Sequence, residues 1–377
     1  MSTLEQVLHL AIASSDGPIP GDDELAEMVR SADPLRSHGE VAQSVAEIRA
    51  HLFGLGPIDS LLRDPTVSDI MINGPGVVWT ESAGRLAASD ITLSSAEVDL
   101  LVERIIAPLG KRADPLHPLV DGRLGDGSRV HIVVPPLAVD GPCITIRRFS
   151  VRPVGLGSFA PRSVCDLLTD CVRSRLNIVV SGATGSGKTT LLNALGAAVP
   201  VTERIVTVED AAELRLEAPH VVRLESRGAS PDGAPEVSIR ELVRNALRMR
   251  PDRLVVGEVR GTEAFDLLAA MSTGHDGSLS TVHANSAPDA LHRLTNLVLM
   301  ADIGLPAQVV LNQLAAAIDL VVHVERDSSG RRVVAEVCEV GPDCGGDGTD
   351  GLVRTVADRH GVVASLSRRA RRNEIQQ

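Results

Sequence analysis

The residues with the clearest chemistry lie in one stretch, which reads Gly182-Ala183-Thr184-Gly185-Ser186-Gly187-Lys188-Thr189 and has the spacing G-x-x-x-x-G-K-T. The apolar run 177–181 before it predicts a buried parallel strand, and residues 190–195 predict a helix after it. Glycines let backbone N–H groups turn toward a phosphate, and the helix presents the positive end of its dipole to the same anion. We therefore predict a nucleotide site in which residues 182–190, Thr190 included, hold the phosphates. Lys188 is expected at the β- and γ-phosphates and Thr189 at Mg²⁺.

Carboxylates follow two of the other apolar runs. Glu209 and Asp210 come directly after the run 205–208, with Glu213 close behind, and Glu258 follows the run 254–256 and Gly257. Ligands of open α/β sheets bind at the carboxyl ends of the strands. Glu258 is therefore expected to face the magnesium and the attacking water. Glu209 and Asp210 fit two interpretations equally. They could polarise water or hold a metal, or they could be acids at a helix N-terminus.

Two histidines bracket a short apolar run at 279–282. His275 precedes the run and follows a Thr-Gly turn, and His283 comes directly after the run. Lone histidines are usually structural or exposed, whereas a pair placed in this way suggests a sensor of the γ-phosphate.

Composition narrows the function classes. The chain has 377 residues, of which 44% are hydrophobic but only 1% aromatic, with Trp79 as the single tryptophan, and its formal net charge is −12. A nucleic-acid binder normally presents a basic face and aromatic stacking platforms, so nucleic acid is an improbable partner. The five cysteines contain no C-x-x-C, which argues against a zinc site. Neither a membrane-spanning run nor a signal peptide is visible, and a cytosolic location is expected.

The order of apolar runs predicts two domains. Residues 1–40 form a variable helical extension, 41–150 a smaller α+β domain, 151–158 a linker, and 159–377 an α/β domain with a doubly wound parallel sheet. The strands expected in the second domain are 177–181, 205–208, 221–224, 254–256 and 279–282. A helix begins at the capping box of Ser238 and Glu241. Its Arg240, Arg244 and Arg248 favour a solvated or subunit-facing surface over nucleic-acid contact.

Taken in order, these motifs resemble the secretion-ATPase superfamily of type II and type IV secretion and type IV pili. The resemblance rests on the phosphate loop (Walker A), the acidic box at Glu209, the Gly257-Glu258 motif (Walker B) and the histidine box, and it extends to residues 70–75, 120–130 and 144–149. Within the superfamily the chain is most similar to the Tad/Flp pilus assembly branch. It lacks the four-cysteine module of the type II and pilus-extension members, and residues 352–377 lack the helical motif of the retraction members.

This resemblance implies a RecA-like P-loop ATPase domain beside the smaller α+β amino-terminal domain, in a homohexamer with ATP and Mg²⁺ between the domains. Arg129 and Arg147 would complete the site, with Arg123 and Arg148 as near candidates. Glu258 would assist metal and water. Glu209 is the chosen general base and Glu213 its rival.

The resulting hypothesis is a motor at the cytoplasmic face of the inner membrane. It would work with membrane platform proteins to assemble a Tad/Flp-type pilus from pilins or to secrete protein effectors. The alternative is a conjugation-type (type IV secretion) ATPase for DNA or effector transfer. A third hypothesis, a structural ring gated by nucleotide with little turnover, is disfavoured by the intact acids. A basic cluster at 368–372, expected to continue a helix from Leu366, fits an acidic membrane surface or a partner better than nucleic acid.

Overall fold

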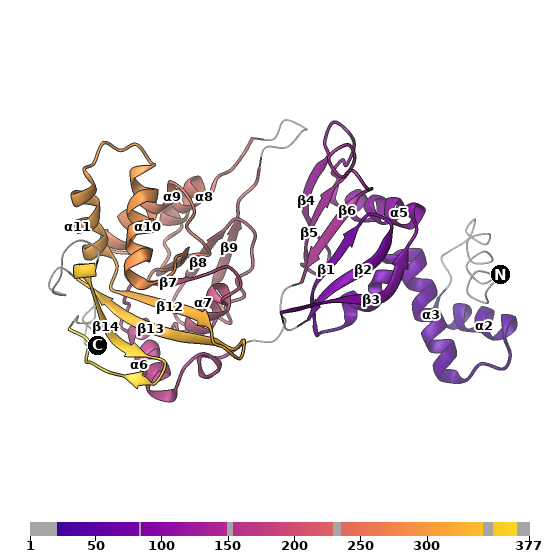
Figure 1. The fold of residues 1–377 in the computed structure, drawn as a ribbon, viewed down its shortest axis with the longest axis horizontal. Coiled ribbons are helices and arrows are strands. Elements are labelled where there is room, and N and C mark those ends of the chain that lie inside the picture. The colour runs from indigo at the N-terminus through magenta and orange to yellow at the C-terminus, as the bar shows by residue number, and fades with distance from the viewer. Residues whose placement is uncertain (1–20, 83, 149–153, 229–234, 342–349, 368–377) are drawn as a thin grey trace. The chain divides into compact units, whose positions relative to one another are not determined.

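The computed structural model describes residues 21–82, 84–148, 154–228, 235–341 and 350–367. They form two compact units, Met1–Val151 and Arg152–Gln377 (Figure 1). Residues 1–20 of the expected helical extension, residues 151–153 of the expected linker and the basic cluster 368–372 lie outside the described residues. Leu366 itself is not helical.

The first unit is built on a six-stranded antiparallel sheet in the order β3-β2-β1-β6-β5-β4. Its inward residues, among them Ile70, Ile132 and Ile146, are fully buried and share one core with Val98 and Ile105 of helix α5. The alternation of buried and exposed residues leaves the other face of the sheet partly exposed, with Arg129, His131 and Arg147 on β5 and β6 and Val77 and Trp79 on β2. The element bounds are β1 Val67–Asn73, β2 Gly76–Ser82, β3 Arg85–Leu93, α5 Ser95–Ile106, β4 Leu119–Arg123, β5 Arg129–Val133 and β6 Cys143–Arg147.

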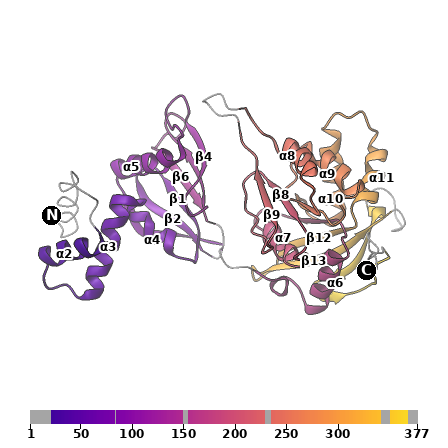
Figure 2. The same cartoon turned by 180° about the vertical axis from the view of Figure 1, so that it is seen from behind.

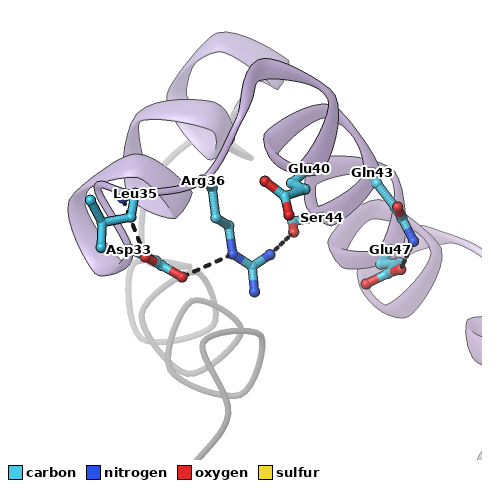
Figure 3. Close-up of a pocket in the computed structure, with 7 residues that line it drawn as sticks. All are labelled: Asp33, Leu35, Arg36, Glu40, Gln43, Ser44 and Glu47. Carbon is cyan, nitrogen blue, oxygen red and sulfur yellow. Dashed lines mark hydrogen bonds and ion pairs between the residues drawn. The ribbon is translucent and has the colours of Figure 1, made fainter.

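Helices precede this sheet, at α2 Asp22–Ala32, α3 His38–Phe53 and α4 Asp59–Arg63. Helices α2 and α3 share a small core that includes Leu25, Val29 and Ile48. The turn after α2 and helix α3 line a polar hollow of about 450 Å³, formed by Asp33, Leu35, Arg36, Glu40, Gln43, Ser44 and Glu47 (Figure 3). Arg36 crosses this hollow to bind Asp33 at 3.2 Å and Ser44. Helix α3 begins at His38, three residues before the expected start of the α+β domain at 41.

The second unit contains a nine-stranded sheet in the order β15-β14-β13-β12-β7-β11-β10-β8-β9. The run from β12 to β9 is parallel, and β13, β14 and β15 pair antiparallel at one edge. The prediction of a parallel sheet is therefore confirmed for the five expected strands. It did not include the parallel strand β12 or the antiparallel strands β13, β14 and β15. The bounds are β7 Ile178–Gly182, β8 Ile205–Glu209, β9 Val221–Glu225, β10 Arg253–Val256, β11 Leu279–His283, β12 Leu320–Arg326, β13 Arg332–Val340, β14 Val353–Asp358 and β15 Gly361–Val362.

Helices cover both faces of this sheet (Figure 1, Figure 2). Val179 of β7 faces the core shared with α8, α9, α10 and α11, while its neighbours Ile178 and Val180 face the core shared with α6 and α7. Two apolar faces explain why the central strands are continuous apolar runs. The helices are α6 Arg162–Arg173, α7 Lys188–Gly196, α8 Ile239–Ala246, α9 Glu263–Ser272, α10 Ala287–Leu299 and α11 Ala307–Ala317. No helix in the described part of the chain is long and apolar enough to cross a membrane.

Two of the three arginines in the row Arg240, Arg244 and Arg248, which begins on α8, form ion pairs within the second unit. The capping box of Ser238 and Glu241 begins the helix as expected. Arg240 Nε and Arg244 Nε each lie 2.7 Å from a different carboxylate oxygen of Asp266 on α9. Arg240 and Arg244 therefore form ion pairs within their own unit, but the Arg244 side chain is still 53% exposed, and the expected solvated or subunit-facing surface stays a prediction.

Candidate nucleotide site

The phosphate loop has the predicted strand-loop-helix form. Strand β7 ends at Gly182, helix α7 begins at Lys188, and the loop joins them. Gly185 and Gly187 have φ values of 72° and 101°, which lie in the left-handed region that glycine adopts without a steric penalty. The loop therefore has the backbone curl that aims N–H groups at an anion.

The ammonium group of Lys188 lies at the mouth of this loop. Its Nζ donates to the carbonyl oxygens of Gly182 and Ala183 at 3.0 and 2.9 Å, and it lies 3.3 Å from Nδ1 of His283. Burial lowers the pKa of Lys188, an effect that Glu258 opposes. Lys188 is thus placed to exchange loop carbonyls for phosphate oxygens.

Glu258 and His283 stand next to this lysine. Oε1 of Glu258 lies 2.8 Å from Nε2 of His283, and its Oε2 accepts from Arg260 at 2.6 Å. The hydrogen bond to Glu258 raises the pKa of Arg260, whereas burial lowers the pKa of His283. His283 therefore bridges Lys188 and Glu258 through its two ring nitrogens.

Glu209 has the environment of a proton acceptor. It is 3% exposed, and its Oε1 accepts from the backbone N–H groups of Glu213 and Leu214 at 2.9 Å each. Its Oε2 is buried and, within the described residues, has no hydrogen-bond partner. Burial raises the pKa of Glu209 to about 7. Gly257 makes room for it, because a Cβ there would lie 2.7 Å from the Glu209 Cγ.

These groups come from four neighbouring strands at one edge of the sheet. In the order β7-β11-β10-β8, the carboxyl ends carry the phosphate loop, His283, Glu258 and Glu209. Buried oxygens of Ser186 and Glu209 that have no hydrogen-bond partner among the described residues mark the same edge as a place for polar ligands. A phosphate loop with carboxylates opposite it suits a nucleotide carrying Mg²⁺, with Thr189 and Glu258 as the residues that would hold the metal. No cluster of three or more His, Cys, Asp or Glu residues that could hold a metal on its own occurs in the described chain.

His275 lies elsewhere. It precedes β11, and its N–H donates to the carbonyl of Ala270 at the end of α9. The whole of β11, about 16 Å at ~3.3 Å per residue, separates this position from His283. His275 therefore does not share a site with His283, because the two flank opposite ends of one strand, and a γ-phosphate role for His283 stays a prediction.

The expected arginines belong to the first unit. Arg129 and Arg147 are directly opposite each other in the β5–β6 ladder, and Arg123 lies opposite Arg129 in the β4–β5 ladder. Arg129 lies 3.6 Å from Asp121, and Arg123 donates to Gly127 O at 3.1 Å.

Arg148 points back into the first unit, where it holds the carbonyl oxygens of Asp64 and Val67. Among the four expected arginines, this one therefore has a structural role. Arg147 is exposed on the face of the sheet that points away from the core of the first unit.

The sequence did not predict three residues that lie near the phosphate loop, namely His323, Arg326 and Arg332. His323 on β12 is 8% exposed and its Nδ1 lies 2.9 Å from Ser181 Oγ, while Arg326 and Arg332 reach the loop itself. Burial lowers the pKa of His323. The turn residues 327–330 between two apolar runs could have predicted a hairpin here. Its place beside β7 depends on strand order, which local pattern does not encode.

Comparison with known proteins identifies the family. The family described as "Type II/IV secretion system protein" matches residues 52–372. A relative from Mycobacterium tuberculosis (strain H37Rv) named "Putative conjugal transfer protein Rv3659c" is 41% identical over 310 residues, 79% of this chain and 88% of that protein. Conjugal transfer protein TrbB of Rhizobium radiobacter is 37% identical, covering 72% of this chain and 83% of its own. Type IV secretion system protein PtlH of Bordetella pertussis is 36% identical, covering 77% and 94%.

Solved structures show the same fold. The Legionella pneumophila ATPase DotB matches with a TM-score of 0.57 at 24% identity, over 75% of this chain and 80% of that one. The pilus retraction motor PilT matches with a TM-score of 0.55 at 22% identity, over 74% and 80%. The expected RecA-like P-loop fold and the superfamily resemblance are thereby confirmed. The chain belongs to the type II/IV secretion system protein family, and it is an ATPase of that family.

Proposed function

We propose that this ATPase is a motor that converts ATP hydrolysis at the Lys188 loop into export across the inner membrane. The observation that carries the proposal is the convergence of Lys188, His283, Glu258 and Glu209 at one edge of the sheet. Bound Mg²⁺, held by Thr189 and Glu258, would neutralise charge on the phosphates.

Glu209 is the proposed general base. Its carboxylate would take one proton from the attacking water, for which Oε2 is available because it has no hydrogen-bond partner in the described part of the chain. A base works best when its pKa lies near the operating pH, and burial places that of Glu209 at about 7. Glu213 remains the rival candidate, and its backbone N–H donates to Oε1 of Glu209.

The arginines of the first unit are proposed to complete the site in a homohexamer. Like charges directly opposite in a sheet repel, and Arg129 and Arg147 form such a pair. A phosphate from a nucleotide would relieve this repulsion. An arginine at the transferring phosphoryl group can contribute about a thousandfold or more to the rate, so closure of the units could gate hydrolysis.

Two kinds of cargo remain in competition. Net charge −12 and 1% aromatic residues support export of pilins or protein effectors, as in Tad/Flp pilus assembly, from the cytoplasmic face of the membrane. The names of relatives from Mycobacterium and Rhizobium refer to conjugal transfer, which supports a conjugation-type ATPase for DNA or effector transfer. We favour protein export on the charge argument.

The deciding experiment measures ATP turnover of the full chain at physiological salt. Additions are vesicles containing acidic phospholipid, single-stranded DNA and duplex DNA. Protein export predicts stimulation by the vesicles and little by DNA. A chain ending at Ser367 loses the basic cluster but keeps the Ser367 bond to Glu339 at 2.9 Å, and it should lose the vesicle response. Strong stimulation by DNA at this salt would replace the export proposal with the conjugation-type one.

A further inference from the structure

The β12–β13 hairpin holds arginines against the phosphate loop. Strand β12 pairs in parallel with β7, and β13 returns antiparallel on its other side. Nε of Arg326 donates to the carbonyl of Gly185 at 3.1 Å, and Nη1 of Arg332 lies 3.4 Å from Oγ1 of Thr190 in the first turn of α7. Helix α7 and this pair of strands lie side by side in both views (Figure 1, Figure 2).

Loop and hairpin fit each other through two glycines. A Cβ on Gly187 would lie 2.6 Å from Cδ of Arg332, and one on Gly182 would lie 2.3 Å from the carbonyl oxygen of Val324. Both distances are shorter than any real side chain tolerates. These loop glycines therefore admit the hairpin as well as a phosphate, and the stem of Arg332 is held against the loop.

The order of the strands gives the site a direction. Strand β7 lies between β11 and β12. Lys188, His283 and Glu258 gather on the β11 and β10 side, which is where the γ-phosphate end belongs. A nucleotide bound in this way extends its α-phosphate over the first turn of α7, toward Thr190 and the hairpin.

We propose that Arg332 binds the α-phosphate of the nucleotide held by its own chain. Arg326 is a positioning residue, because it ties the loop at Gly185 to the hairpin turn at Gly330, to which its Nη1 donates at 3.3 Å. The planar guanidinium suits this role, since it offers several donors to phosphate oxygens at once. The inference rests on the proposed nucleotide site and adds a contact from the same subunit, in contrast to the arginines of the first unit.

The test is the dissociation constant of the full chain for ADP and for ATP, measured by calorimetric titration. Arg332→Ala should weaken both nucleotides by the same factor, about tenfold or ~1.4 kcal/mol, because both carry the α-phosphate. Arg332→Lys keeps the charge but loses the planar fork, so its effect should be intermediate.

Arg331→Ala is the matched control. Arg331 is the neighbouring arginine on the hairpin, its side chain is 78% exposed, and its guanidinium binds Asp327 at 3.0 Å instead of the loop. Its removal should leave both dissociation constants unchanged.

Lys188→Ala separates this inference from the proposed site. If Lys188→Ala loses nucleotide binding while Arg332→Ala binds ADP and ATP as the wild type does, the inference on Arg332 is overturned and the nucleotide site stands. If Arg332→Ala weakens ATP alone, the contact is with the γ-phosphate and the α-phosphate assignment is wrong. If Lys188→Ala binds both nucleotides normally, the nucleotide site itself is refuted.

Discussion

Replacing Glu209 by glutamine should reduce the dependence of stability on pH. Burial raises the folded-state pKa of Glu209 from its ordinary value of 4.5 to about 7. Between these two values the unfolded chain ionises this carboxyl while the folded chain keeps it protonated, so stability falls as pH rises through the window. Above about 7 both states are ionised and the loss is complete. Glutamine does not titrate and removes this loss.

The magnitude follows from the shift. Each pKa unit corresponds to ~1.36 kcal/mol, so the full cost of ionising Glu209 in the folded state is ~3.4 kcal/mol. Integrating from about pH 5.5 to about pH 8 gives a loss of ~2 kcal/mol in the wild type from this group alone. The free energy of unfolding of Glu209→Gln minus that of the wild type should therefore be ~2 kcal/mol larger at about pH 8 than at about pH 5.5. This comparison between two pH values cancels the pH-independent cost of burying an amide.

The assay is urea unfolding of the nucleotide-free chain, with hydrogen exchange of peptides from β7 and β8 reporting on the second unit. Trp79, the single tryptophan, lies in the first unit, so its fluorescence provides an internal control that the substitution should not alter. Glu217→Gln, at an exposed glutamate of the second unit, is the matched variant for the same chemical change away from the site. Equal effects of Glu209→Gln at both pH values would refute the argument from burial.

Two further predictions concern turnover. Arg147→Ala should lower kcat while changing nucleotide affinity by less than about tenfold, because its charge is needed mainly where negative charge builds up on the transferring phosphoryl group. Arg85→Ala, at an exposed arginine of the same sheet, is its control, and an unaltered kcat in Arg147→Ala would remove Arg147 from the site. The pH profile of kcat/KM should rise through an apparent pKa near 7 as Glu209 loses its proton, and this limb should be absent from Glu209→Gln; a profile that is flat between about pH 6 and 8 would contradict the role of Glu209 as base.

Local motifs predicted the phosphate loop, the strand ends that carry Glu209 and Glu258, and the capping box of α8. Each of these features depends on residues a few positions apart, where spacing and backbone geometry are directly linked. The strand order of the second unit could not be predicted from such local motifs. This order places β12 beside β7 and so brings Arg326 and Arg332 to the phosphate loop, although more than 130 residues separate these arginines from the loop along the chain.

Tertiary contacts also show what spacing along the chain leaves out. Arg240 and Arg244 repeat along one face of α8, and Asp266 of a neighbouring helix binds both while the Arg244 side chain stays exposed. His275 and His283 look like a pair along the chain, but a strand holds them at opposite edges of the sheet. In both cases the sequence contained the right residues and only the packing showed what they meet.

The central claim, that ATP is hydrolysed at the Lys188 loop with Glu258 at its metal, is tested most directly by Glu258→Gln. This change keeps the shape of the side chain and removes its charge. ATP turnover and ATP binding are measured on the same purified protein, beside Lys188→Ala. The account predicts that Glu258→Gln abolishes turnover but still binds ATP, and that Lys188→Ala abolishes turnover too. Turnover at the wild-type rate in Glu258→Gln would contradict it.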